Sequence, residues 1–113
     1  MRQAEFFDRE ADRLGAAPPV IDASDVLANP PVVLTKLCDA LDIPWDEGML
    51  YWPPGRRPTD GPWAPHWYGA VEASTGFGPP DTGAVDLPDD ARRLADQMRP
   101  YYERLAAYRL TSV

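Results

Sequence analysis

Apolar positions recur at helical spacing in three stretches of this chain, within residues 2–14, 30–43 and 88–110. Charged residues fill the opposite side of each stretch. The three apolar faces consist of Ala4, Phe7, Ala11 and Leu14; Val33, Leu34, Leu37, Cys38 and Leu41; and Leu94, Met98, Tyr101, Leu105 and Tyr108. The pattern therefore predicts a mainly α-helical chain.

Residues that favour helix ends mark the boundaries of these stretches. Gly15 offers a stop for the first helix. Asn29 and Pro30 suit the N-cap and the first position of the second helix, and Pro44 closes it. Pro100 lies inside the third stretch and predicts a kink or a split there.

One short strand is predicted between the first two helices, at Val20 and Ile21. No second strand is predicted to pair with it, so its backbone N–H and C=O groups need partners from elsewhere. Asp22 and Asp25 follow this strand. They fit either a paired acid site or a turn that Asp25 caps, and the turn is the favoured interpretation.

Residues 44–87 form a Pro/Gly/Trp-rich irregular segment, in which most of the 14 prolines lie. One short helix is predicted within it, from about Pro65 to Ala73. Its tryptophans and tyrosine are interpreted as core filling, because large rings packed on helices would fix a loop that has no ladder. The prediction is a single small domain, 1–113, with helix–strand–helix (1–43), this segment (44–87) and a kinked C-terminal helix (88–113).

The charge balance opposes polyanionic partners. The net charge is −7, and no Lys/Arg stripe offsets it, which argues against nucleic acid. No apolar run approaches the roughly 20 residues of a membrane span, so we expect a cytoplasmic protein without a membrane partner. A lone Cys38 and a lone His66 cannot supply four zinc ligands, so no metal is expected.

Several segments, in order, resemble one protein family. The strand ends in Asp22-Ala23-Ser24-Asp25-Val26-Leu27, a helix opening with a proline follows, and a box Trp63-Ala64-Pro65-His66-Trp67-Tyr68 with Ser74-Thr75-Gly76-Phe77 comes later. Together with the final helical stretch, they resemble the C-terminal half of bacterial sulfotransferase-family proteins. The resemblance implies half of an α/β P-loop fold that uses 3′-phosphoadenosine 5′-phosphosulfate as donor.

The parts that such chemistry needs are missing from the 113 residues. There is no Gly-rich loop with Lys and Ser/Thr, and the one lysine, Lys36, lies on the polar side of the second helix. The leading interpretation is a truncated or split sulfotransferase-family protein, inactive alone, with no catalytic residue and no cofactor unless a P-loop half completes it. The alternatives are a stand-alone interaction module and a C-terminal fragment of a complete enzyme. A homodimer or an upstream P-loop chain is the expected partner.

Two groups of residues are candidates for binding. For an anionic cofactor, Arg56 and Arg57 offer charge, and Ser74-Thr75-Gly76 offers backbone N–H groups. The alternatives are a solvated arginine pair and a trio that simply stops a helix, with the glycine in the left-handed conformation.

For a substrate, an aromatic group is the candidate, and its members are Trp63, His66, Trp67 and Tyr68. The rings suit a stacking platform, and the histidine suits a general base. However, no Ser, Cys or Asp is placed nearby to form a relay with His66, so a hydrogen-bonding histidine in an aromatic cluster is the favoured interpretation.

Overall fold

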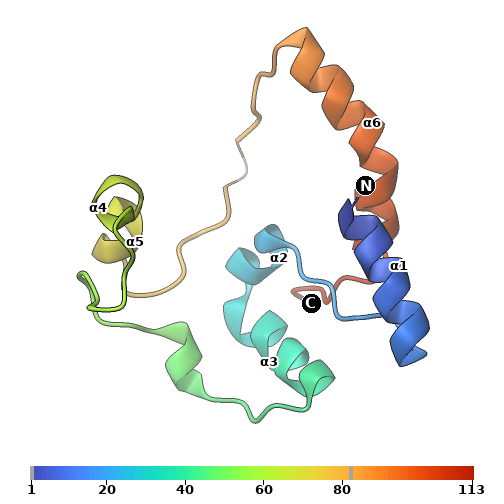
Figure 1. Ribbon diagram of the computed structural model, residues 1–113. Helices are drawn as coiled ribbons and strands as arrows, with labels where there is room; N and C mark the ends of the chain where they lie inside the picture. The colour runs from blue at the N-terminus through green and yellow to red at the C-terminus, as the bar shows by residue number, and fades with distance from the viewer. Residues whose placement is uncertain (1, 82) are drawn as a thin grey trace.

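The chain is mainly helical in the computed structural model, which describes residues 2–81 and 83–113. Figure 1 shows the arrangement of the elements. They are α1 (Arg2–Leu14), α2 (Ala23–Ala28), α3 (Pro30–Leu41), the 3-10 helix η1 (Glu47–Leu50), α4 (Ala64–Trp67), α5 (Gly69–Ala73) and α6 (Asp89–Ala106). The described residues form isolated bridges and no sheet. The mainly α prediction is therefore confirmed.

Helix α1 has the predicted bounds, and Gly15 follows it with a φ of 70°, a conformation that favours glycine. Ala4 and Phe7 are buried, whereas Leu14, on the same predicted face, is exposed. The ring of Phe7 lies 5.1 Å from the ring of Tyr108, which follows α6. Only the first half of the apolar face therefore reaches the core.

Helix α3 begins at Pro30 as predicted, but the cap differs. Asn29 occupies the N-cap position without a side-chain hydrogen bond to the helix. Its side-chain Nδ2 instead donates to the backbone oxygen of Ser112 at 3.4 Å. The predicted N-cap position of Asn29 is therefore confirmed, but its amide contacts the C-terminal segment and does not cap α3.

A helix that the sequence did not predict, α2, follows Val20 and Ile21. Its N-cap is Asp22, whose Oδ1 accepts from the backbone N–H of Ser24 at 2.9 Å. Asp25 lies in the first turn of α2, so its predicted capping role is wrong. A helix of six residues is too short to display a 3.6-residue period, which is why the pattern did not reveal it.

The predicted strand is reduced to a single bridge. Val20 pairs in parallel with Arg109, and the backbone N–H of Leu110 donates to the carbonyl of Val20 at 2.8 Å. Ile21 is about half exposed. The chain's own C-terminal segment therefore supplies the partner that the sequence appeared to lack, on one side of Val20.

Helix α6 is not split at Pro100. The helix continues through this proline to Ala106 and ends four positions before the predicted Leu110. A proline removes one N–H donor but holds a helical φ, so the surrounding turns continue the helix.

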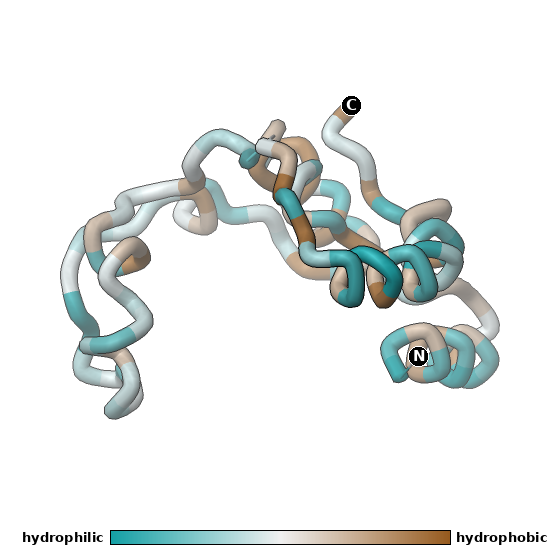
Figure 2. The backbone as a smooth tube through the Cα atoms, turned by 90° about the horizontal axis from the view of Figure 1, so that it is seen from above, coloured by the Kyte–Doolittle hydropathy of each residue, from teal (hydrophilic) through white to brown (hydrophobic). Residues whose placement is uncertain are grey.

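The tryptophans of the Pro/Gly/Trp-rich segment do not fill a common core. Trp67 is 78% exposed and Trp63 is 55% exposed. Trp52 is half-buried, with its ring centroid 5.3 Å from that of Phe77 in an edge-on contact. The core-filling interpretation is therefore wrong for Trp63 and Trp67, because α4 and α5 lie apart from α1 and α6 (Figures 1 and 2).

The buried hydrophobic side chains are few among the described residues: Ala4, Phe7, Val33, Cys38 and Ala64. The accessible surface is 8735 Å², whereas a compact chain of this mass exposes about 6,200 Å². The radius of gyration is 17.0 Å, against roughly 13 Å for a compact chain of this length. The helices therefore leave a large apolar area in contact with solvent.

Candidate functional site

The two arginines proposed for an anion are engaged within their own loop. Arg56 Nε lies 3.1 Å from Oε1 of Glu72 on α5. The guanidinium of Arg57 donates to the carbonyls of Pro53 at 2.8 Å and Gly55 at 3.2 Å. These bonds hold the loop before α4, and they use one side-chain N–H of Arg56 and two of Arg57, so each guanidinium keeps further donors.

The Ser74-Thr75-Gly76 trio follows α5 and closes its end. Ser74 Oγ donates to the carbonyl of Val71 at 2.6 Å and accepts from Trp52 Nε1 at 2.8 Å. Gly76 pairs with Tyr51 in an antiparallel bridge and is not in the left-handed conformation that the helix-stop interpretation gave it. A Cβ at Gly76 would lie 3.1 Å from the carbonyl oxygen of Leu50, so close approach explains the glycine.

The aromatic candidates cluster around α4. Trp63 Nε1 donates to the hydroxyl of Tyr68 at 3.1 Å. His66 is exposed on α4, and its side chain makes no hydrogen bond to a residue that the structure describes. These four residues lie close together in space. Among the residues that the structure describes, no hydrogen-bonded partner that could make His66 a general base and no anion-binding group lies with them.

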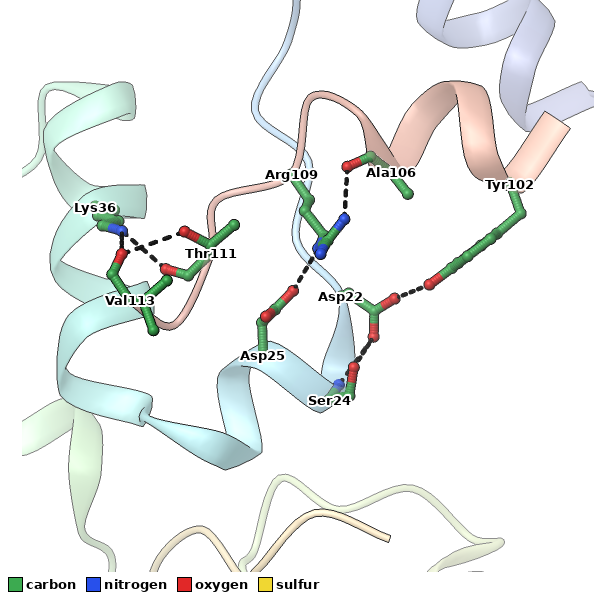
Figure 3. Close-up of polar contacts among 9 residues, drawn as sticks. All are labelled: Asp22, Ser24, Asp25, Lys36, Tyr102, Ala106, Arg109, Thr111 and Val113. Atoms are coloured by element: carbon green, nitrogen blue, oxygen red, sulfur yellow. Dashed lines mark hydrogen bonds and ion pairs between the residues drawn. The ribbon is translucent and has the colours of Figure 1, made fainter. Parts of the chain in front are cut away.

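A different polar cluster forms where the start of α2 meets the end of α6 (Figure 3). Asp22 accepts from Ser24 through Oδ1, with Ser24 Oγ at 2.7 Å, and its Oδ2 accepts from the hydroxyl of Tyr102. Tyr102 is 80 positions away in the sequence. The cluster therefore depends on the tertiary fold.

Arg109 and Asp25 extend this cluster. Arg109 Nε lies 3.0 Å from Asp25 Oδ2, and its Nη1 donates to the carbonyl of Ala106 at 3.2 Å. Nearby, Lys36 Nζ donates to the backbone oxygens of Thr111 at 2.9 Å and Val113 at 2.5 Å. The chain's one lysine thus fixes its C-terminal segment and is not available for a phosphate in this arrangement.

The hydrogen bonds determine the charge of Asp22. The Tyr102 hydroxyl, followed by Ser24, lowers the pKa of Asp22 from 3.8 to about 2. The same bond raises the pKa of Tyr102 above its ordinary value. Asp22 is consequently a fixed negative charge at neutral pH and a poor proton acceptor.

Two cavities adjoin this cluster. One, of about 360 Å³, lies between α1, residues 20–23 and α6, and the other, of about 380 Å³, lies between α2 and the end of α6. Both are lined by Asp22, Tyr102, Ala106 and Arg109. An apolar space and a polar space therefore share one wall.

The sequence pattern drew attention to Asp22 and Asp25 as a possible acid pair, but it could not identify Tyr102 or Arg109. The missing signal was the pairing of Val20 with Arg109, which brings the end of α6 beside α2. Within the described chain, no group of three His, Cys, Asp or Glu side chains is placed to hold a metal ion. None of the described helices is both long and apolar enough to cross a bilayer.

Comparison with known proteins gives one family. A family model described as a sulfotransferase domain matches residues 2–109. Two curated relatives from Arabidopsis thaliana, named Branched-chain-amino-acid aminotransferase-like protein 1 and protein 2, are each 38% identical over 96 residues. The matched part is 85% of this chain but 17% of each relative, so the chain spans a small part of their length. No solved structure matches the chain.

Proposed function

Since this chain belongs to the sulfotransferase-domain family, we propose that it is the C-terminal part of a sulfotransferase fold and works only together with a P-loop-bearing part. In this proposal the P-loop part binds 3′-phosphoadenosine 5′-phosphosulfate, and this chain completes the fold around it. The P-loop part either precedes this sequence in a longer protein or is a separate chain.

The excess surface is the observation that carries the proposal. The chain exposes about 2,500 Å² more than a compact chain of its mass. Obligate interfaces bury about 1,000–2,500 Å² on each partner, so the excess on this one chain is as large as one side of a large obligate interface. At about 25 cal/mol per Å² of apolar area, covering it would contribute tens of kcal/mol of gross burial energy before the entropic costs.

The hydrogen bonds of three basic side chains support the proposal that the P-loop part binds the donor. Arg56, Arg57 and Lys36 all bond to carboxylate or carbonyl oxygens of this chain. With a net charge of −7, the chain alone repels a polyanionic nucleotide. Both observations support a division in which the P-loop part, and not this chain, binds the donor.

Reconstitution tests the proposal. The 113-residue chain is titrated calorimetrically with adenosine 3′,5′-bisphosphate, first alone and then mixed with a P-loop-bearing part from the same protein. We expect the chain alone not to bind the nucleotide. In the mixture, we expect the two parts to form a complex that binds the nucleotide. Low-micromolar binding to the isolated chain would contradict the proposal and would direct attention to Arg56, Arg57 and Ser74.

A second candidate function is a protein-interaction module, and the exposed rings of Trp63 and Trp67 favour it. Sedimentation of the chain, first alone and then with the P-loop part, distinguishes the two functions. A stable homodimer that takes up no P-loop part supports the module, whereas a chain that assembles with the P-loop part supports the sulfotransferase proposal.

A further inference from the structure

Asp22 and Tyr102, which are joined by a hydrogen bond (Figure 3), line both an apolar cavity and a polar cavity. The polar cavity adds Asp25 and Glu103 to this wall. The apolar cavity, of about 360 Å³, is near the lower size limit of small-molecule pockets. Its apolar lining consists of Ala4, Val20, Ile21, Met98, Tyr101 and Leu105.

The shared wall offers hydrogen-bond acceptors. An ionised carboxylate has about four lone-pair positions, and three donors already reach Asp22, namely the N–H and hydroxyl of Ser24 and the hydroxyl of Tyr102. One acceptor position of Asp22 is left. Because Tyr102 donates its proton to Asp22, its oxygen also keeps accepting capacity toward a ligand.

The charge at this wall favours a cation. Three carboxylates, of Asp22, Asp25 and Glu103, face one guanidinium, of Arg109, which leaves two negative charges. Arg109 is itself bonded to Asp25 and to the carbonyl of Ala106, so little of its charge is left for an anionic ligand. Tyr101, which lines the apolar cavity, adds an aromatic ring to the surroundings of a hydrocarbon body.

We propose that the two cavities form one binding site for a small apolar amine, with the ammonium group at Asp22 and Tyr102 and the hydrocarbon body in the apolar cavity. An alcohol of the same shape would lose the charge attraction, and a carboxylate would be repelled. The inference needs no sulfuryl transfer and goes beyond the sulfotransferase proposal, so either can fail without the other.

Three matched probes test the site on the 113-residue chain: 2-phenylethylammonium, 2-phenylethanol and 3-phenylpropionate. Binding is followed by amide chemical shifts, with the resonances of Asp22, Tyr102 and Leu105 as reporters. We expect the amine to bind about tenfold or more tightly than either other probe, as a charge-assisted hydrogen bond requires. Equal binding of the alcohol, or no response to millimolar amine, overturns the proposal.

Two carboxylates of α1 and α2 provide a matched pair of variants. Asp22→Asn removes the charge but keeps a good N-cap, and it should weaken amine binding about tenfold or more. Asp8→Asn removes the same charge from the Asp8–Arg104 pair, which lines neither cavity, and should leave binding unchanged. If both variants weaken amine binding equally, the effect comes from the net charge of the chain, and the proposed site is wrong.

A third variant keeps the test valid if Asp22→Asn does not fold, as judged by circular dichroism. Met98 lines the apolar cavity but not the polar one, so Met98→Trp introduces bulk into the apolar cavity from α6. It should abolish binding of the amine while the carboxyl resonance of Asp22 stays where it is in the unmodified chain. Unchanged amine binding in this variant places the ligand elsewhere and overturns the proposal.

Discussion

At the scale of single residues, Asp22 joins two roles that are usually separate. It caps α2 through Ser24 and receives the hydroxyl of Tyr102 from α6. Each donor stabilises the carboxylate, so the three hydrogen bonds from Ser24 and Tyr102 together keep it ionised in a half-buried position. A capping residue thus also supplies the fixed charge of the cluster.

Tyr102→Phe should raise the pKa of Asp22 from about 2 toward its ordinary 3.8, because the largest stabilising bond is lost. The folded pKa lies below the unfolded one, so the carboxylate stabilises the fold above pH 4, and this contribution is lost as the pH falls toward 2. In the variant, less stability is lost over that range. The titration of the Asp22 carboxyl carbon by NMR measures the shift. Tyr101→Phe is the control and should leave the titration as it is.

A second residue-scale prediction concerns Gly76. Gly76→Ala places a Cβ 3.1 Å from the carbonyl oxygen of Leu50, so the bridge between Tyr51 and Gly76 must shift, at a cost of about 1–3 kcal/mol. Gly78→Ala meets nothing within 4 Å and should be neutral or slightly stabilising. Chemical denaturation compares the two variants. Equal stabilities of the two variants would show that the backbone at Leu50 shifts without a loss of free energy.

At the scale of elements, the helices with a sustained period were predictable from the sequence. The bounds of α1 and the starts of α3 and α6 agree with the prediction, because apolar spacing and end residues coincide there. The bridge at Val20 and the Asp22–Tyr102–Arg109 cluster were not predictable. They join residues 80 or more positions apart, and local spacing carries no information about such pairs.

The packing of α1 against the end of α6 gives an element-scale prediction. Phe7 is 8% exposed and contacts the ring of Tyr108, so Phe7→Ala should lower the free energy of unfolding by about 3–5 kcal/mol. The neighbouring Phe6 is 55% exposed, and Phe6→Ala should cost about 1 kcal/mol or less. Thermal melts of both variants decide the matter. Similar melting temperatures would mean that α1 does not dock as described.

At the scale of the whole molecule, the excess of surface accompanies one departure from the sequence interpretation. Large rings were expected to fix the irregular segment by burial, yet α4 and α5 lie apart from α1 and α6 (Figure 1). The described residues bury few hydrophobic side chains in total. A chain with so small a core leaves the rings of Trp63 and Trp67 in contact with solvent.

The exposed ring of Trp67 gives the last prediction. Trp67 is 78% exposed, so Trp67→Ala should change the stability of the chain by less than about 1 kcal/mol, in contrast to the 3–5 kcal/mol expected of a core ring. Val33→Ala, at a side chain of 0% exposure, should cost roughly 2 kcal/mol.

The two variants should rank in the opposite order in assembly with a partner. Sedimentation with the P-loop-bearing part should show weaker assembly for the Trp67 variant and nearly normal assembly for a folded Val33 variant, because only the tryptophan is available to a partner. If the Trp67 variant loses much stability but assembles normally, Trp67 belongs to the core and the prediction is wrong.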